Sequence, residues 1–193
     1  MLREGIAAVL ASEQDMLLVA EASNGREALE QFRTHQPDVT LMDVQMPEVN
    51  GIDAIAKIRE EFPDARIIVL TTYTGDAQAT RAFKAGASGY LLKNMLRKEL
   101  IDTIRTIHSG KKKIPPELAV EMAQHHSDDA LTEREIQVLR EVAAGNANKM
   151  VAQLLRVSEE TVKAHMRSIL SKLGANDRTH AVTIAVKRGI IEI

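Results

Sequence analysis

VTLMDVQMPEVNG, residues 39–51, is the stretch that decides the fold of this chain. Its first four residues form an apolar run long enough for one buried strand, and Pro47 and Gly51 behind it indicate a loop. Asp43 closes the run. Because open α/β sheets place ligands and chemistry at the carboxyl ends of their strands, Asp43 is a candidate functional residue. An isolated acid there usually caps the next helix, so the rest of the chain has to decide between the two roles.

Strands and helices alternate along the first 109 residues. Apolar spacing predicts further strands at 17–21, 66–70 and 89–92, and helices at 2–12, 26–35, 52–62, 77–85 and 97–109. This alternation indicates an α/β fold, a doubly wound parallel sheet covered by helices on both faces.

Three polar residues, Asp43, Thr71 and Lys93, each end one of these apolar strands. In a parallel sheet they would lie together at one edge. A carboxylate, a hydroxyl and an ammonium there can accept a phosphoryl group, hydrogen-bond to it and balance its charge. Taken singly, Thr71 is an ordinary helix N-cap and Lys93 a solvated lysine, but the coincidence of all three favours a functional site.

From residue 131 onward the pattern contains helices alone. Thr132 followed by Glu135 is a capping-box pattern, and helices are expected at 132–144, 148–155, 158–173 and 177–187. Two short helices, a tight turn at 156–157 and a longer helix make a helix-turn-helix. Away from the apolar stripe, the longer helix presents Lys163, Ala164, Arg167 and Ser171. That cationic face suits the major groove, although a lone helix with such a face is more often simply exposed.

Charge and composition narrow the function classes. Residues 1–130 contain 15 Lys and Arg and 20 Asp and Glu, which gives a net charge of −5. Residues 131–193 contain 10 Lys and Arg and 7 Asp and Glu, which gives a net charge of +3. The uneven charge favours an acidic part that responds to a partner, at 1–130, and a basic part that binds a polyanion, at 131–193. The absence of cysteine excludes disulfides, thiol catalysis and Cys-based metal sites. No apolar span or signal peptide is present, so we expect a cytoplasmic protein with no membrane partner.

The segments LMDVQMPEVNG, VLTTYTGD and KAGASGYLLKN resemble the receiver domain of two-component response regulators, which has a flavodoxin-like fold. The resemblance implies that Asp43 is the phosphoacceptor and Lys93 the invariant lysine. It also implies that Thr71 is the switch hydroxyl, with Thr72 as a near alternative, and that Tyr90 is the switch aromatic.

The front of the receiver pattern is missing. In the family a first strand ends in two adjacent acids that hold Mg²⁺, and that strand lies inside a sheet of order 2-1-3-4-5. This sequence begins at the helix that follows, so Asp43 and the backbone carbonyl of Gln45 would form an incomplete Mg²⁺ site. The acidic pair Asp128-Asp129 lies in a polar stretch and is no substitute. We therefore expect slow phosphorylation of Asp43, or none.

Three explanations fit the missing strand. We favour an internal start within a longer protein. A truncation whose sheet is completed by swapping or by a shifted strand is the second explanation, and a relic receiver used for packing and dimerisation is the third.

The stretch LTEREIQVLREVAAGNANKMVAQLLRVSEETVKAHMRSILSKLGANDRTHAV strongly resembles the LuxR-type DNA-binding domain of NarL/FixJ response regulators. The resemblance implies that Lys163, Ala164 and Arg167 meet base edges. It implies phosphate contacts by residues at or near Thr161, Lys149 and Lys172. In the same family Glu133 and Glu135 are structural acids.

The sequence is therefore interpreted as a receiver at 1–109, a linker at 110–130 and a LuxR-type helix-turn-helix domain at 131–193. This organisation implies a transcriptional regulator of a two-component system, not an enzyme. Its expected partners are a histidine kinase, promoter half-sites in double-stranded DNA and a second copy of the chain. The main alternative is a phosphorylation-independent DNA-binding regulator with a degenerate receiver. An aspartyl-phosphate hydrolase would need a second acid close behind Asp43, where Val44 and Gln45 stand.

Overall fold

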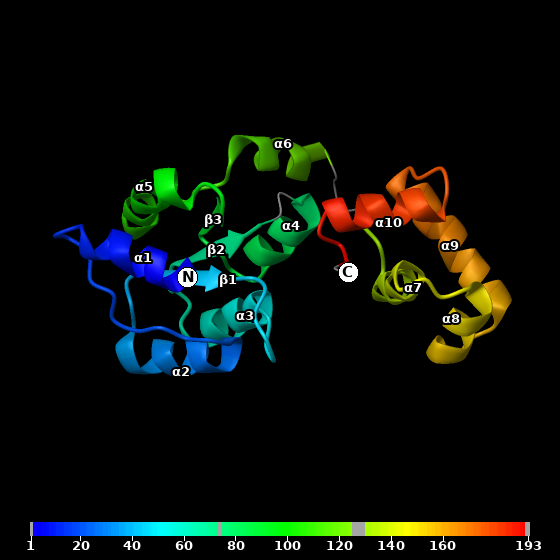
Figure 1. The fold of residues 1–193 in the computed structure, drawn as a ribbon, viewed down its shortest axis with the longest axis horizontal. Helices are drawn as coiled ribbons and strands as arrows, with labels where there is room; N and C mark the ends of the chain where they lie inside the picture. The colour runs from blue at the N-terminus through cyan, green and yellow to red at the C-terminus, as the bar shows by residue number, and fades with distance from the viewer. Residues whose placement is uncertain (1, 73–74, 125–129, 192–193) are drawn as a thin grey trace. The chain divides into compact units, whose positions relative to one another are not determined.

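The computed structural model describes residues 2–72, 75–124 and 130–191, so the acidic pair at 128–129 lies outside the described residues. The chain divides into two compact units (Figure 1). One contains residues 1–72 and 81–115, and the other contains residues 73–80 and 116–193. Within the described ranges, no helix is long and apolar enough to cross a membrane.

The first unit contains a parallel sheet with the strand order β1-β2-β3. The strands are β1 (Thr40–Asp43), β2 (Ile67–Thr71) and β3 (Gly89–Leu92). The helices between and around them are α1 (Leu2–Ala11), α2 (Gly25–His35), α3 (Gly51–Glu61), α4 (Asp76–Lys84) and α5 (Leu96–His108), and residues 76–80 of α4 are assigned to the second unit. The α/β expectation is confirmed, and these strands and helices lie within one or two residues of the predicted boundaries.

Helices cover both faces of this sheet, with α1 and α5 on one face and α2 and α3 on the other (Figure 1). On the first face Ile68 and Leu70 of β2 pack with Leu100 and Ile107 of α5. All five residues of β2 are buried, as a central strand covered on both sides requires. The parallel register pairs Asp43 with Leu70 and Thr71 with Leu92. The carboxyl ends of the three strands therefore share one edge.

The strand expected at 17–21 is wrong. This segment has no regular structure, and Leu17 is 83% exposed, with Leu18 and Val19 also exposed. A strand is stable only when its backbone groups pair with a neighbour. In the described part of the chain β1 is an edge strand, and no strand lies on its outer side to receive this segment.

Residues 110–124, within the predicted linker, include one contact with the sheet and one helix. Lys113 pairs with β3, because its carbonyl accepts from the Tyr90 amide at 3.1 Å and its amide donates to the Ser88 carbonyl at 3.2 Å. Helix α6 (Pro116–Gln124) follows.

The second unit contains the predicted helix-turn-helix. Its helices are α7 (Glu133–Ala143), α8 (Asn148–Leu155), α9 (Glu159–Leu173) and α10 (Arg178–Lys187). Thr132 and Glu135 form the predicted capping box, and the Ser158 side chain caps α9. Arg156 adopts a left-handed conformation with φ 55°, which makes the tight turn between α8 and α9. Val138, Leu139, Val151, Val162 and Ile169 are fully buried between these helices.

Candidate phosphoacceptor site and nucleic-acid interface

Asp43 and Lys93 meet at the carboxyl edge of the sheet. Lys93 Nζ donates to Asp43 Oδ2 at 2.5 Å, and the Gln45 amide donates to Oδ1 at 3.0 Å. The side chains of Asp43 and Lys93 are 28% and 20% exposed, so solvent still reaches this pair. The structure therefore brings together two of the three strand-end residues that the sequence singled out.

Thr71 and Tyr90 form a second pair on the adjacent strands β2 and β3. Both are almost fully buried, and the Tyr90 ring lies 6.3 Å from that of Phe83 between centroids. Burial raises the pKa of Tyr90 to about 12, against the opposing effect of a hydrogen bond with the Thr71 side chain. The expected switch hydroxyl and switch aromatic are therefore hydrogen-bonded to each other. Thr72, the alternative hydroxyl, is exposed.

The loop behind Asp43 is held by a close backbone approach. A Cβ at Gly51 would lie 2.0 Å from the Asp43 carbonyl oxygen, so only glycine fits. The Gly51 amide donates to the Val44 carbonyl at 3.0 Å, and Asn50 caps α3 through the Asp53 amide. The sequence indicated Gly51 only as a loop residue. Its packing against Asp43 depends on the folded loop, which spacing does not reveal.

The described residues do not fit a Mg²⁺ site. No group of three or more Asp, Glu or His among them could hold a metal ion. The Asp43 carboxylate accepts from Lys93 and from Gln45, which faces it through its amide N–H. Mg²⁺ needs near-octahedral oxygen coordination, and one carboxylate already bound by two donors does not supply it.

Helix α9 presents the expected DNA-reading residues to solvent. Lys163, Ala164 and Arg167 are exposed. Thr161 is half-buried, and its hydroxyl lies 2.8 Å from that of Ser158. Lys149, on α8, is exposed. Lys172, like Thr161, is half-buried, and its side chain is 25% exposed.

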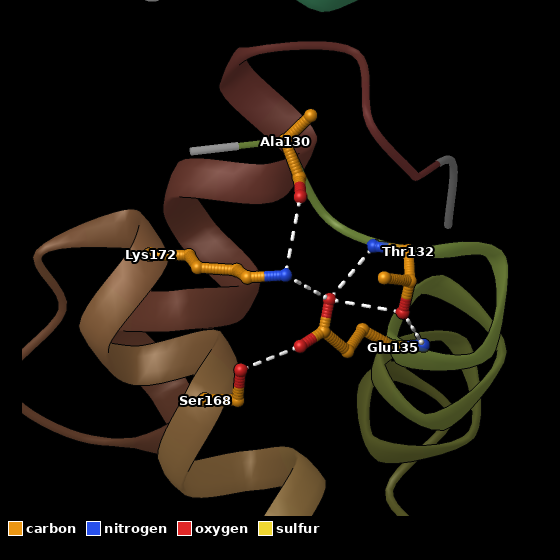
Figure 2. A network of polar contacts seen from close by, with 5 residues as sticks. All are labelled: Ala130, Thr132, Glu135, Ser168 and Lys172. Carbon is orange, nitrogen blue, oxygen red and sulfur yellow. Dashed lines mark hydrogen bonds and ion pairs between the residues drawn. The ribbon is translucent and has the colours of Figure 1, made fainter. Parts of the chain in front are cut away.

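Lys172 belongs to a buried polar network centred on Glu135. Figure 2 shows Lys172 and Ser168 reaching the Glu135 carboxylate from α9, at 2.8 Å and 2.6 Å. The Thr132 amide donates to the same carboxylate at 2.7 Å, and Lys172 also donates to the Ala130 carbonyl at 3.2 Å. The side chains of Glu135 and Lys172 are 5% and 25% exposed. The network thus ties the start of α7 to the second half of α9.

Hydrogen bonding keeps Glu135 ionised. Burial raises its pKa, but the bonds from Lys172, Ser168 and Thr132 outweigh burial and bring the pKa down to about 2. The capping box was readable from the sequence. The bonds to Ser168 and Lys172 were not, because those residues lie 33 and 37 positions away.

Two known families match the chain. The response regulator receiver domain matches residues 1–105, and the luxR family of bacterial regulatory proteins matches residues 129–185. Transcriptional regulatory protein LnrK of Bacillus subtilis strain 168 is 37% identical over 204 residues, which cover 97% of this chain and 93% of that protein.

Solved structures agree with these matches. The response regulator ChrA of a heme-sensing two-component system is 35% identical and has a TM-score of 0.54, over 98% of this chain and 93% of that one. RcsB from Salmonella enterica serovar Typhimurium, bound to promoter DNA, has a TM-score of 0.71 over 96% of this chain and 93% of that one. At 24% identity, RcsB shows the fold alone. The chain belongs to the two-component response regulators that join a receiver domain to a LuxR-type DNA-binding domain, and it is a transcriptional regulator of that family.

Proposed function

We propose that a histidine kinase phosphorylates this regulator on Asp43 and that a dimer of the chain then binds promoter DNA through α9. The observation that supports phosphorylation of Asp43 is its contact with Lys93, beside the buried Thr71–Tyr90 pair. Asp43, Thr71 and Lys93 stand at or directly after the carboxyl ends of three neighbouring strands, and Tyr90 lies within β3.

The chemistry of the site supports a switch. A phosphoryl group on Asp43 adds roughly −1.5 to −2 charges and strong acceptor oxygens. Lys93 balances the new charge, and Thr71 donates to the new oxygens. Thr71 then gives up its hydrogen bond to Tyr90, so the aromatic ring is released to change its packing. The altered face around Tyr90 favours dimerisation.

Mass spectrometry of the whole chain after incubation with a small phosphodonor tests the phosphoacceptor. We expect slow addition of one phosphoryl group to the wild type and none to Asp43→Asn. Labelling of Asp43→Asn at the wild-type rate would remove Asp43 from this role. Rapid Mg²⁺-dependent labelling of the wild type would instead overturn the expectation of slow phosphorylation.

The proposed DNA interface places Lys163, Ala164 and Arg167 against base edges, with Thr161, Lys149 and Lys172 near phosphates. In a dimer, two copies of α9 would enter major grooves about 34–36 Å apart, or a multiple of that. Arg167→Ala should weaken binding to a selected duplex by about 1–3 kcal/mol and relax the sequence preference at one base pair. An unchanged sequence preference in this variant would show that Arg167 does not contact base edges.

A second candidate, regulation without phosphorylation, is favoured by a separate observation. The Asp43 carboxylate already has two donors, Lys93 and the Gln45 amide, and the described residues lack a fitting Mg²⁺ site. This candidate predicts equal DNA affinity for the wild type, before and after phosphodonor treatment, and for Asp43→Asn. The phosphorylation proposal predicts that phosphodonor treatment tightens binding by the wild type alone.

A further inference from the structure

The first turn of α9 carries two acids in front of its cationic face. Glu160 Oε2 lies 3.6 Å from Lys163 Nζ, and Glu160 Oε1 lies 3.4 Å from an Arg167 guanidinium nitrogen. Glu159 Oε1 lies 3.6 Å from Lys163 Nζ and makes no ion pair with Arg167. Glu160 therefore contacts both cations proposed to read bases, whereas Glu159 contacts one.

Helix geometry explains this difference. Positions 160, 163 and 167 are spaced by three and four residues, so they form one stripe along α9. Arg167 is long enough to reach back along that stripe to Glu160. All three side chains are about half exposed or more, with 73%, 49% and 73% for Glu160, Lys163 and Arg167. The cluster is therefore at the surface, where DNA would meet it.

We propose that Glu160 is a specificity-determining residue, which restrains Lys163 and Arg167 from binding phosphate at random sequences. This inference rests on the proposed DNA interface. A cation that leaves a carboxylate for a phosphate exchanges one anion for another and gains little. The carboxylate itself is repelled by the phosphate backbone.

A matching base sequence changes this balance. A guanine offers Arg167 two acceptors, O6 and N7, in a geometry that a single carboxylate oxygen does not match. A cytosine amino group offers Glu160 a donor, which no phosphate does. Glu160 thus weakens binding to non-specific duplex. At a site that presents a guanine to Arg167 and a cytosine amino group to Glu160, the new hydrogen bonds offset this loss.

A simpler role for Glu160 would be general. Acidic residues in the first turn stabilise the positive end of a helix, and this effect applies equally to Glu159 and Glu160. Glu159→Gln is therefore the matched control. It makes the same charge change in the same turn and leaves the Glu160–Arg167 pair intact.

Binding of the full-length chain to two labelled duplexes tests the proposal. One duplex has a random sequence, and the other is selected in vitro from a random pool with the wild-type chain. At about 0.1 M salt, Glu160→Gln should tighten binding to the random duplex by roughly tenfold. The slope of log affinity against log salt concentration should become steeper by an amount that corresponds to about one to two more phosphate contacts. Binding to the selected duplex should not tighten, so the ratio of the two affinities falls.

The control separates pairing from charge. Glu159→Gln should tighten binding to the random duplex much less, and unchanged thermal unfolding of both variants would show that α9 is intact. Equal effects of the two variants, or an unchanged affinity ratio in Glu160→Gln, would overturn the proposal. Failure of the wild type to select any duplex would instead contradict the proposed DNA-binding function.

Discussion

Glu135 carries a buried, hydrogen-bonded charge in the DNA-binding domain. It accepts hydrogen bonds from Thr132, Ser168 and Lys172 while almost fully buried. Its pKa of about 2 in the folded chain lies below the ordinary value of 4.5. A depressed pKa contributes stability above the ordinary value, and this stability is lost as the pH falls towards 2.

Glu135→Gln should therefore destabilise the DNA-binding domain by roughly 3 kcal/mol at pH 7, because Lys172 keeps its charge without a counter-charge. The difference from the wild type should shrink between pH 4.5 and pH 2, where the wild-type carboxylate becomes protonated. Chemical unfolding followed by far-UV circular dichroism at several pH values measures this. Glu133→Gln, an exposed acid in the same turn, should cost far less. Equal losses in the two variants would show that the buried network contributes nothing.

Lys149 and Lys172 should differ in their contribution to DNA binding. Lys149 is exposed and makes no ion pair with the described residues, whereas Lys172 is bound to Glu135 and to the Ala130 carbonyl. Lys149→Ala should reduce the slope of log DNA affinity against log salt concentration by about one, the value of one lost phosphate contact. Lys172→Ala should mainly lower the free energy of unfolding. A larger change of slope in Lys172→Ala, from titrations at 50–200 mM salt, would reverse this assignment.

At the scale of elements, β1 has one paired and one open side. The amides of Thr40 and Val44 donate to the carbonyls of Arg66 and Leu70, at 2.9 Å and 3.1 Å. Because backbone groups alternate along a strand, the amide of Leu41 points to the other side. No strand of the described chain lies there.

Hydrogen exchange followed by NMR should show this asymmetry. The amides of Thr40 and Val44 should exchange slowly, and the amide of Leu41 should exchange much faster. The central strand β2 serves as the internal control, since it pairs on both sides. Strong protection of Leu41 in the full-length chain would mean that another strand pairs with β1 in solution.

The elements also show how far sequence could predict this molecule. The caps at Thr132 and Ser158 were predictable because a cap involves residues only three positions apart. The strand at 17–21 was predicted wrongly, because apolar composition indicates a tendency to pair and cannot supply the partner. The meeting of Asp43 with Lys93 was predictable because parallel strands align their carboxyl ends. The bonds of Glu135 to α9 required the packing of two helices, which no local pattern contains.

At the scale of the whole chain, opposite charges are divided between its two parts. Residues 1–130 carry −5 and residues 131–193 carry +3. A tethered acidic part repels a polyanion that the basic part binds. The repulsion acts only over the screening length of the salt solution.

A fragment of residues 130–193 should therefore bind random-sequence duplex more tightly than the full chain at low salt. The difference should be several-fold at about 0.05 M salt and should vanish near 1 M, where the screening length is about 3 Å. Fluorescence anisotropy across a salt series measures it. A difference independent of salt would point to a steric cause instead of charge.

Glu135 and Glu160 of the DNA-binding domain differ in how their substitution would affect the protein. Glu135 is almost fully buried and ion-paired with Lys172, so its replacement lowers the stability of the domain whatever it does to recognition. Glu160 stands on the surface of α9 with a side chain that is 73% exposed, so we expect that it can be exchanged while the fold persists. After a gene duplication, two copies of this regulator could therefore diverge in their target promoters by single substitutions at an exposed position, without first acquiring extra stability.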